Sequence, residues 1–264
     1  MNKILPSLIL GSLLLAGCAS SQKADASAGD HNAAAGGTET ITFATEGTYA
    51  PYSYHDEDGN LTGYDVKLAQ AVADKLGADA EFVETQWDGI VAGLDAKKYD
   101  VIANQVSYSP EREEKYLFST PYTYAYGTLI VPGDSDIAEF QDLKGKKSAQ
   151  TATSNWSALA ESYGAEIVGT SGFPESIQLV EQGRADATIN DNVTWLDYKK
   201  QKPETTAKAV AQSDEATKAG FLLRKDEKEL QERIDKALQE LKDDGTIKKI
   251  SEEYFGEDIS EPAQ

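Results

Sequence analysis

The arginine of the stretch ANQVSYSPERE, residues 103–113, is the first candidate for ligand chemistry in this chain. Arg112 follows Ser109-Pro110, a pair typical of the N-cap and first position of a short helix. Its planar guanidinium suits a carboxylate, which it can bind through two parallel hydrogen bonds. Taken alone, such an arginine is more often a surface ion-pair partner, and three glutamates lie within two positions of it.

Carboxylates and aromatic side chains elsewhere in the chain complement this arginine. Asp191, after the apolar stretch ATIN, could accept hydrogen bonds from an ammonium group, and Glu46 is a second candidate acceptor. Tyr49 and Trp87 offer aromatic faces to the body of a ligand and to a cation. A guanidinium, carboxylates and aromatic faces together fit a small zwitterion.

Small hydroxyl and amide side chains follow other predicted strands. Gln105 and Ser107 follow the strand DVIAN, and Ser154 and Asn155 precede the helical stretch WSALAESYG. Each residue alone is more often structural, because an aspartate after a strand is commonly a helix cap and a tryptophan on an amphipathic helix is usually in the core. Their common position after successive strands favours function, since open α/β sheets bind ligands at the carboxyl ends of their strands.

Strands and helices alternate along the chain. After the strand ITFAT from residue 41, the stretch YDVKLAQAVADKLG has one apolar helical face and ends at Gly77, a C-cap position. The strand AEFVE, the helix WDGIVAGLDAKKYD and the strand DVIAN complete an order that predicts a parallel sheet with crossover helices. The pattern restarts at TLIVP, so we expect two α/β units with a ligand pocket between them.

The N-terminal residues predict export and attachment to a membrane. Residues 1–17 have a basic start, an apolar segment and small residues before Cys18, as in a signal peptide. The sequence LAGC resembles a bacterial lipobox, in which the cysteine is lipidated, and residues 18–40 are small and polar like a flexible tether. An ordinary signal peptide with an incidental cysteine is the alternative. We expect a lipid anchor on the extracytoplasmic side of a membrane and, because Cys18 is the sole cysteine, no disulfide.

Composition argues against several other functions. The 264 residues carry a formal net charge of −20, which disfavours nucleic acid as a partner. Of the two histidines only His55 lies in the predicted folded part, so a nucleophile–histidine triad and a zinc site are poorly supported. Asp56, Asp58 and Asn60 fit a hairpin turn better than a calcium loop, because the glycine comes too early. We therefore expect no metal, no cofactor and no catalytic residue.

Long stretches of the chain resemble the amino-acid-binding proteins of ABC importers, the family 3 type of extracellular solute-binding protein. The resemblance covers residues 41–256 and is carried by EGTYAPYSYHDEDGNLTGYDVKLAQAVADKLG, FVETQWDGIVAGLDAKKYDVIANQVSYSPEREEKYLFSTPY, DLKGKK, GRADATINDN and the C-terminal stretch from GFLLRK onward. It implies that Arg112 clamps the α-carboxylate of an amino acid with help from Ser107 and Asn155. It also implies that Asp191 accepts hydrogen bonds from the α-ammonium.

The same resemblance implies an α/β, two-lobed, periplasmic-binding-protein-like fold of type II, with a cleft between the lobes and a two-strand hinge. Lobe 1 would comprise residues 41–127 and 222–264, and lobe 2 residues 128–221. The residues that it places in the pocket from lobe 1 are Glu46, Tyr49 and Trp87. The family usually has Gly-Thr-Thr or Gly-Thr-Ser where this chain has Thr153-Ser154-Asn155, so the carboxylate contact there departs from the family pattern.

Within the family, the stretch VETQWDGIVAGLDAKKYDVIANQVS looks most like the L-cystine-binding members. One amino-acid head of cystine would use Arg112 and Asp191, and the other would need further polar groups such as Gln105 and Asn104. The resemblance implies capture by hinge closure and delivery to an ABC permease with its ATPase, with the binding protein acting as a monomer.

Three alternatives remain open at this point. The ligand could be another amino acid. The chain could be a cyclohexadienyl-dehydratase-like lyase on the same fold, in which Glu46 would be the general acid or base. It could also be a ligand-sensing module of a membrane receptor.

Overall fold

The computed structural model describes residues 38–262, and the predicted signal peptide and Cys18 lie outside them. The first strand, β1 (Glu39–Thr45), begins two residues before the expected start at Ile41. Its early start has a physical reason, because Glu39 and Thr40 already pair with β5 (Ala78–Glu84). The chain from Thr38 onward forms one compact unit. Among the described residues, no helix is both long and apolar enough to cross a membrane.

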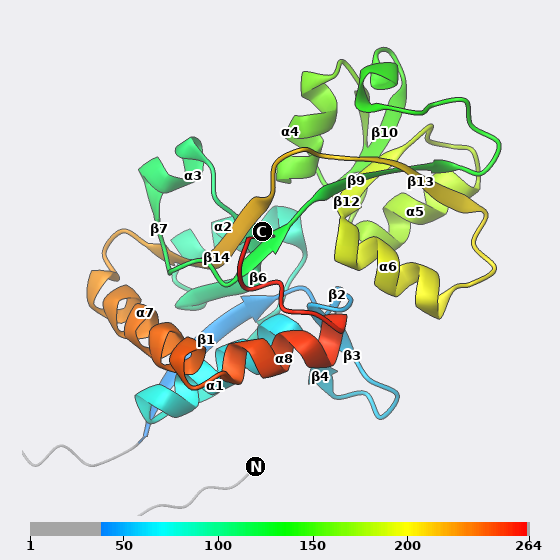
Figure 1. Ribbon diagram of the computed structural model, residues 1–264. Coiled ribbons are helices and arrows are strands. Elements are labelled where there is room, and N and C mark those ends of the chain that lie inside the picture. The colour runs from blue at the N-terminus through cyan, green and yellow to red at the C-terminus, as the bar shows by residue number, and fades with distance from the viewer. Residues whose placement is uncertain (1–37, 263–264) are drawn as a thin grey trace, which may run out of the picture. The chain divides into compact units, whose positions relative to one another are not determined.

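A mixed sheet of six strands contains β1, and β2, β3 and β4 form a separate small sheet (Figure 1). β1, β5 and β6 (Val101–Ser107) run parallel, as predicted, and their order in the sheet is β5-β1-β6. β14 (Thr217–Arg224) lies antiparallel beside β6 and also pairs with β7 (Tyr116–Phe118) and β8 (Thr123–Ala125). A strand from late in the chain therefore completes the sheet that the first strands begin.

Helices cover both faces of this sheet. They are α1 (Tyr64–Leu76), α2 (Trp87–Asp95), α7 (Lys228–Asp243) and α8 (Thr246–Phe255). Successive strand residues point to opposite faces, so Phe43 and Phe221 pack with α1, α7 and α8, whereas Ala44 and Leu222 pack with α2. All seven residues of β6 are buried, as expected for a strand covered on both faces.

The middle of the chain forms separate strands around β9 (Gly127–Pro132). β12 (Thr188–Asp191) and β13 (Ala207–Gln212) both pair antiparallel with β9, and β10 (Lys147–Gln150) pairs parallel with β11 (Glu166–Gly169). This half is thus not a simple parallel repeat of the first. β13 was not predicted, because its sequence AKAVAQ is rich in alanine and only pairing with β9 makes it a strand.

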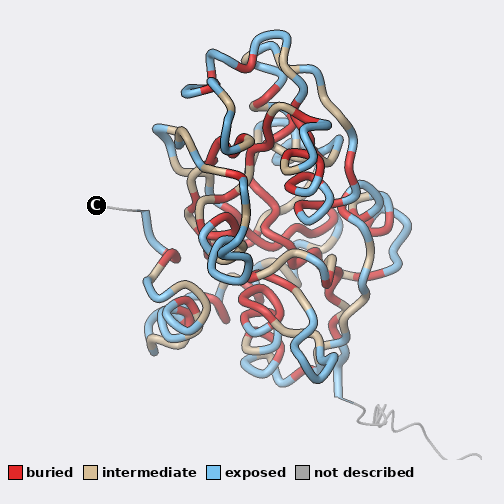
Figure 2. The backbone as a smooth tube through the Cα atoms, turned by 90° about the vertical axis from the view of Figure 1, so that its right-hand side faces the viewer, coloured by how far each residue is buried: buried red, intermediate tan, exposed pale blue. Residues whose placement is uncertain are grey.

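The remaining elements are short strands and the helices of the middle region: β2 (Thr48–Tyr49), β3 (Ser53–His55), β4 (Leu61–Thr62), α3 (Pro110–Lys115), the 3-10 helix η1 (Phe140–Leu143), α4 (Asn155–Ser162), α5 (Phe173–Glu181) and α6 (Asn192–Gln201). Buried residues follow the strands and the inner sides of the helices, and exposed residues lie on the outer turns (Figure 2). The predicted C-cap of α1 is confirmed, since Gly77 is left-handed with φ of 68°.

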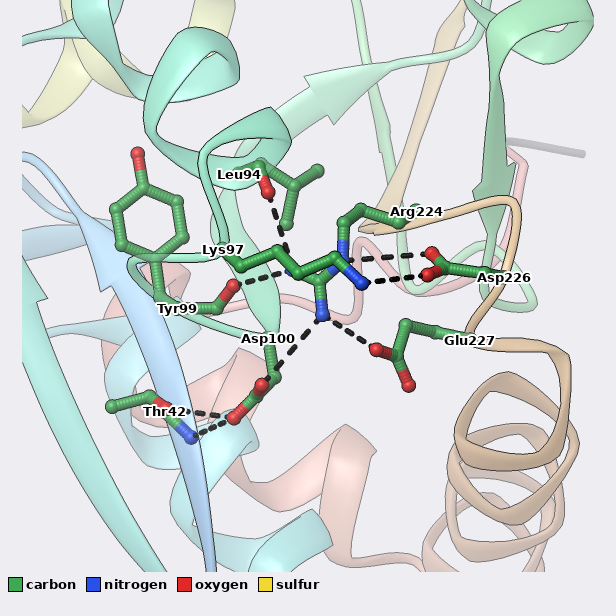
Figure 3. Close-up of polar contacts among 8 residues, drawn as sticks. All are labelled: Thr42, Leu94, Lys97, Tyr99, Asp100, Arg224, Asp226 and Glu227. Atoms are coloured by element: carbon green, nitrogen blue, oxygen red, sulfur yellow. Dashed lines mark hydrogen bonds and ion pairs between the residues drawn. The ribbon is translucent and has the colours of Figure 1, made fainter.

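Arg224, the last residue of β14, is a buried cation that ties several segments together (Figure 3). Its Nη1 donates to the carbonyl oxygens of Leu94 at 3.2 Å and Tyr99 at 2.7 Å. Its Nη2 lies 2.5 Å from a carboxylate oxygen of Glu227 and 3.8 Å from one of Asp100. The end of α2, the turn before β6 and the start of α7 are thereby held around the end of β14.

We expect Arg224→Met to lower the free energy of unfolding by about 2 to 3 kcal/mol, because buried carbonyl groups and Glu227 lose their donor. Urea unfolding followed by circular dichroism measures the loss. Arg233→Met is the matched control, since Arg233 pairs with Glu39 at the surface, where ion pairs contribute less than about 1 kcal/mol. Equal losses in the two variants would contradict a special role for Arg224.

Candidate functional site

A cavity lies where the carboxyl ends of β1, β6 and β12 converge with the starts of α4 and α5. Its position is the one expected for ligands of α/β sheets. Of the nine predicted ligand-binding residues, all except Arg112 line it: Glu46, Tyr49, Trp87, Gln105, Ser107, Ser154, Asn155 and Asp191. The cavity lining contains no lysine, arginine or histidine.

Asp191 is a nearly buried carboxylate at the end of β12, and its side chain is available to a cation. Its Oδ2 accepts a hydrogen bond from the hydroxyl group of Tyr49 at 2.7 Å. Burial raises the pKa of Asp191 to about 6, against the opposing effect of the tyrosine hydrogen bond. Because no cation among residues 38–262 neutralises it, an ammonium group in the cavity would be strongly favoured.

Glu46 follows β1 and is held by an asparagine of β6. Its backbone N–H donates to Oδ1 of Asn104 at 2.9 Å, and Nδ2 of Asn104 donates to Oε2 of Glu46 at 2.7 Å. Oδ1 of Asn104 also accepts from the hydroxyl group of Thr45 at 2.9 Å. Burial, with a smaller contribution from Asp88, raises the pKa of Glu46 to about 7. Asn104 is therefore engaged in positioning Glu46.

Gln105 adopts an unusual backbone conformation beside the cavity, with φ of 51°. Both its backbone N–H and its side-chain Nε2 donate to Asp65, at 2.8 and 2.7 Å. Asp65 lies in the first turn of α1, is completely buried and does not line the cavity. Burial raises the pKa of Asp65 to about 7, although the hydrogen bonds from Gln105 oppose the rise.

Arg112 lies in the first turns of α3, next to the cavity rather than in its wall. The predicted cap is confirmed, because the backbone N–H of Arg112 donates to Oγ of Ser109 at 3.3 Å. The guanidinium donates to the carbonyl oxygens of Ser107 and Thr153, each at 2.9 Å. Its carbon Cζ lies 5.6 Å from the ring centre of Trp87.

The guanidinium of Arg112 has no ion-pair partner within residues 38–262. Among the neighbouring glutamates, Glu111 pairs instead with Lys115 at 3.0 Å. Burial lowers the pKa of Arg112, and Glu111 opposes that effect. Arg112 lines a hollow that shares Trp87, Ser154 and Asn155 with the cavity. A cation without a carboxylate partner therefore stands at one side of the cavity, and Asp191 lies in its wall.

The turn before α4 is already occupied by protein contacts. Oδ1 of Asp88 accepts from the backbone N–H of Thr153 at 3.1 Å and from its hydroxyl group at 2.9 Å. The hydroxyl group of Ser154 caps α4 by accepting from the N–H of Ser157 and donates to the carbonyl oxygen of Thr151, each at 3.0 Å. These groups are engaged, whereas Asn155 lines the cavity with a free side chain amide in the described part of the chain.

Trp87 contributes more than an aromatic face. The residue is 7% exposed, and its indole Nε1–H is buried without a hydrogen-bond partner in the described residues. A buried donor without a partner is costly, and a ligand or water could satisfy it.

Sequence reasoning missed the part of the wall that follows β10 and β11. The missed cavity residues are Gln150, Thr151, Trp156, Gly172, Phe173, Ser176 and Asn190. The other cavity residues were predicted because they follow strands of an α/β sheet. The same rule would have found several of the missed residues, because SAQT and AEIVGTSGF also run from a predicted strand toward a helix.

Comparisons with known proteins match nearly the whole described region. The family model of bacterial extracellular solute-binding proteins, family 3, matches residues 41–257. A probable amino-acid ABC transporter-binding protein of Haemophilus influenzae is 48% identical over 225 residues, which are 85% of this chain and 88% of that protein. The L-cystine-binding protein TcyA of Bacillus subtilis is 44% identical over 222 residues, 83% of this chain and 82% of that protein.

A solved structure adds information on conformation. The L-cystine solute receptor of Neisseria gonorrhoeae, in the unliganded open conformation, is 47% identical, covers 85% of this chain and 96% of its own, and superposes with a TM-score of 0.57. That score is low for chains so similar in sequence, as expected when lobes are displaced relative to one another. Here Tyr49 of β2 contacts Asp191 of β12, and Asp88 of α2 contacts Thr153 before α4, so the early part and the middle part of the chain meet at the cavity.

The buried carboxyl groups predict that the unliganded protein becomes more stable as the pH falls from 8 to 5. Their pKa values of about 6 to 7 exceed the ordinary value of about 4, so the folded state binds protons more tightly than the unfolded state. Urea midpoints at pH 5, 6, 7 and 8 measure the trend. Asp191→Asn removes one such group and should show a smaller slope; an unchanged slope would contradict the raised pKa of Asp191.

Proposed function

The chain belongs to the bacterial extracellular solute-binding proteins, family 3, and we propose that it captures an amino acid outside the cytoplasm and delivers it to an ABC permease. Its fold is the predicted two-lobed α/β fold of type II periplasmic binding proteins. The observation that carries the proposal is the pair formed by Asp191, a carboxylate in the wall of the cavity, and Arg112, a guanidinium in the adjoining hollow. A carboxylate and an ammonium on one carbon atom are the ligand groups that match this pair.

L-cystine is the proposed ligand. Two relatives named for L-cystine are 44% and 47% identical to this chain over most of its length. Cystine has two ammonium groups, and the cavity offers two carboxyl groups, Asp191 and Glu46, on different elements. One carboxylate of the ligand would reach Arg112, and the free amide of Asn155 and the indole N–H of Trp87 are further donors beside it. The ligand would thus be matched group by group.

Capture proceeds by closure of one lobe on the other. In the open state the ligand meets the groups of one lobe, and only in the closed state does it meet Arg112 and Asp191 together, so it favours closure. The direct contacts of Thr153 with Asp88 and Arg112 add to the stability of the closed state without ligand. These contacts are few and partly exposed, which leaves reopening accessible when the permease binds.

Membrane attachment is proposed from the sequence alone. Lipidation of Cys18, followed by a polar tether, would hold the protein near its permease on the extracytoplasmic side while leaving it free to move. The protein would act as a monomer with one ligand.

Arg112→Met should weaken L-cystine binding about 10- to 100-fold, because a charged hydrogen-bonding group contributes about 1.5 to 3 kcal/mol. Isothermal titration calorimetry measures the affinity, after a thermal-shift panel of amino acids has shown L-cystine to stabilise the wild type most. Arg184→Met, which removes an exposed arginine, is the matched control. Unchanged affinity in Arg112→Met would refute the carboxylate role, provided that its melting temperature without ligand is retained.

A lyase is a second candidate because Glu46, with a pKa of about 7 inside the cavity, has the properties of a general acid or base. We expect no turnover, since the relatives are named as binding proteins. Incubation with L-cystine and with arogenate, followed by mass spectrometry, should return both compounds unchanged. If the wild type forms a product and Glu46→Gln does not, the protein is a lyase instead.

A further inference from the structure

We infer that Asp65, which lies outside the cavity, fixes the Gln105 amide so that its oxygen faces the ligand and accepts hydrogen bonds from an ammonium group. Asp65 is in this sense a positioning residue for ligand recognition. The inference rests on the proposed function, because it concerns the binding of an amino acid in this cavity.

Asp65 is a fully buried carboxylate whose principal partner is Gln105. It is 0% exposed and forms no ion pair with a lysine or arginine among residues 38–262. Oδ2 accepts from the backbone N–H of Gln105 at 2.8 Å, and Oδ1 accepts from its Nε2 at 2.7 Å. A buried carboxylate needs such hydrogen bonds, and here they come from a residue in the wall of the cavity.

The backbone of Gln105 is held in a conformation that a glutamine rarely adopts. Its φ of 51° lies in the left-handed region, and the pairing of β6 with β14 is irregular at this point. Such irregularities re-aim side chains at the ends of strands, and they persist when surrounding contacts fix them. The two hydrogen bonds to Asp65 join the backbone and the side chain of Gln105 to the same carboxylate, so they fix both.

The direction of the amide follows from the chemistry of its partner. Nε2 of Gln105 lies 2.7 Å from Oδ1 of Asp65, and the ionised form of that carboxylate accepts hydrogen bonds only, so it holds the NH2 group of Gln105 toward Asp65. The same nitrogen lies 3.2 Å from the hydroxyl oxygen of Thr123, which accounts for its second hydrogen. Oε1 is left on the opposite side, with no donor among residues 38–262, on a residue that lines the cavity.

An acceptor at this place complements the carboxyl groups already described. Glu46 and Asp191 line the same cavity, and its wall contains no cationic side chain. An ammonium group has three hydrogens and needs several acceptors around it. Gln105 Oε1 supplies a neutral acceptor, and it does so only while Asp65 prevents the amide from turning round.

The test is a double-mutant cycle between Asp65 and Gln105, with L-cystine affinity measured by calorimetry. Asp65→Asn can pair with either orientation of the Gln105 amide, so it should weaken binding about 5- to 20-fold, and Gln105→Ala by a similar factor. Asp65→Asn should have no further effect in the Gln105→Ala background. If it weakens binding as much in that background as in the wild type, Asp65 does not act through the amide and the inference fails.

A swapped pair gives a second readout that a merely structural role would not produce. In Asp65→Asn/Gln105→Glu, the new amide can donate to one oxygen of the new carboxylate, which leaves the other oxygen facing the cavity. Affinity within about 3-fold of the wild type supports the inference, and a folded variant with affinity as low as that of Asp65→Asn overturns it. If Asp65→Asn alone does not fold, Gln105→Ala is the reference, and a folded swapped variant that binds no more tightly than Gln105→Ala overturns the inference.

The proposed ligand is checked separately in the wild type. If wild-type protein binds another amino acid of the panel instead of L-cystine, the ligand proposal fails and the cycle is run with that amino acid. The positioning role of Asp65 is then judged on its own result.

Discussion

The antiparallel pairing of β14 with β6 is the interaction on which the site depends. β6 carries Asn104, Gln105 and Ser107 to the edge of the cavity, and β14 secures it on the side away from β1. Arg224 at the end of β14 binds backbone carbonyl groups on either side of the turn that leads into β6. The strand that returns from the middle of the chain thus holds the strand that presents the site.

Charge is distributed unevenly around the cavity. Glu46 and Asp191 lie in its wall and Asp65 behind it, each with a pKa raised by burial. The guanidinium of Arg112 lies to one side and has no carboxylate partner within residues 38–262. A zwitterionic ligand supplies an ammonium group for the carboxylates and a carboxylate for Arg112. Without a ligand these charged groups are buried and unpaired, which is energetically unfavourable. An amino acid pairs with them, and this gain on binding favours closure around the ligand.

Much of the site could be predicted from the rule that open α/β sheets bind ligands at the carboxyl ends of their strands, because strands and the polar residues near their ends are recognisable in short segments. Gln105 and Asp191 could be placed near a cavity because each lies toward the carboxyl end of a predicted strand, although β6 and β12 extend further than expected and include them. The cap at Ser109 followed from Ser-Pro. The start of α5 was missed because the rule was not applied to every strand. Asp65 could not be predicted, because an acid in the first turn of a helix ordinarily faces water and interacts with the helix dipole.

The sequence by itself determined the helices, the parallel direction of β1, β5 and β6, and the kinds of groups available to a ligand, since periodicity and side-chain chemistry are properties of short segments. Only the tertiary structure decided which groups meet. Pairing between distant strands brings Asp191 to Tyr49, and burial then raises the pKa of Asp191. Contacts between residues far apart in the chain determine how deeply each carboxyl group is buried, and the burial determines its pKa. Neither can be predicted from a single segment.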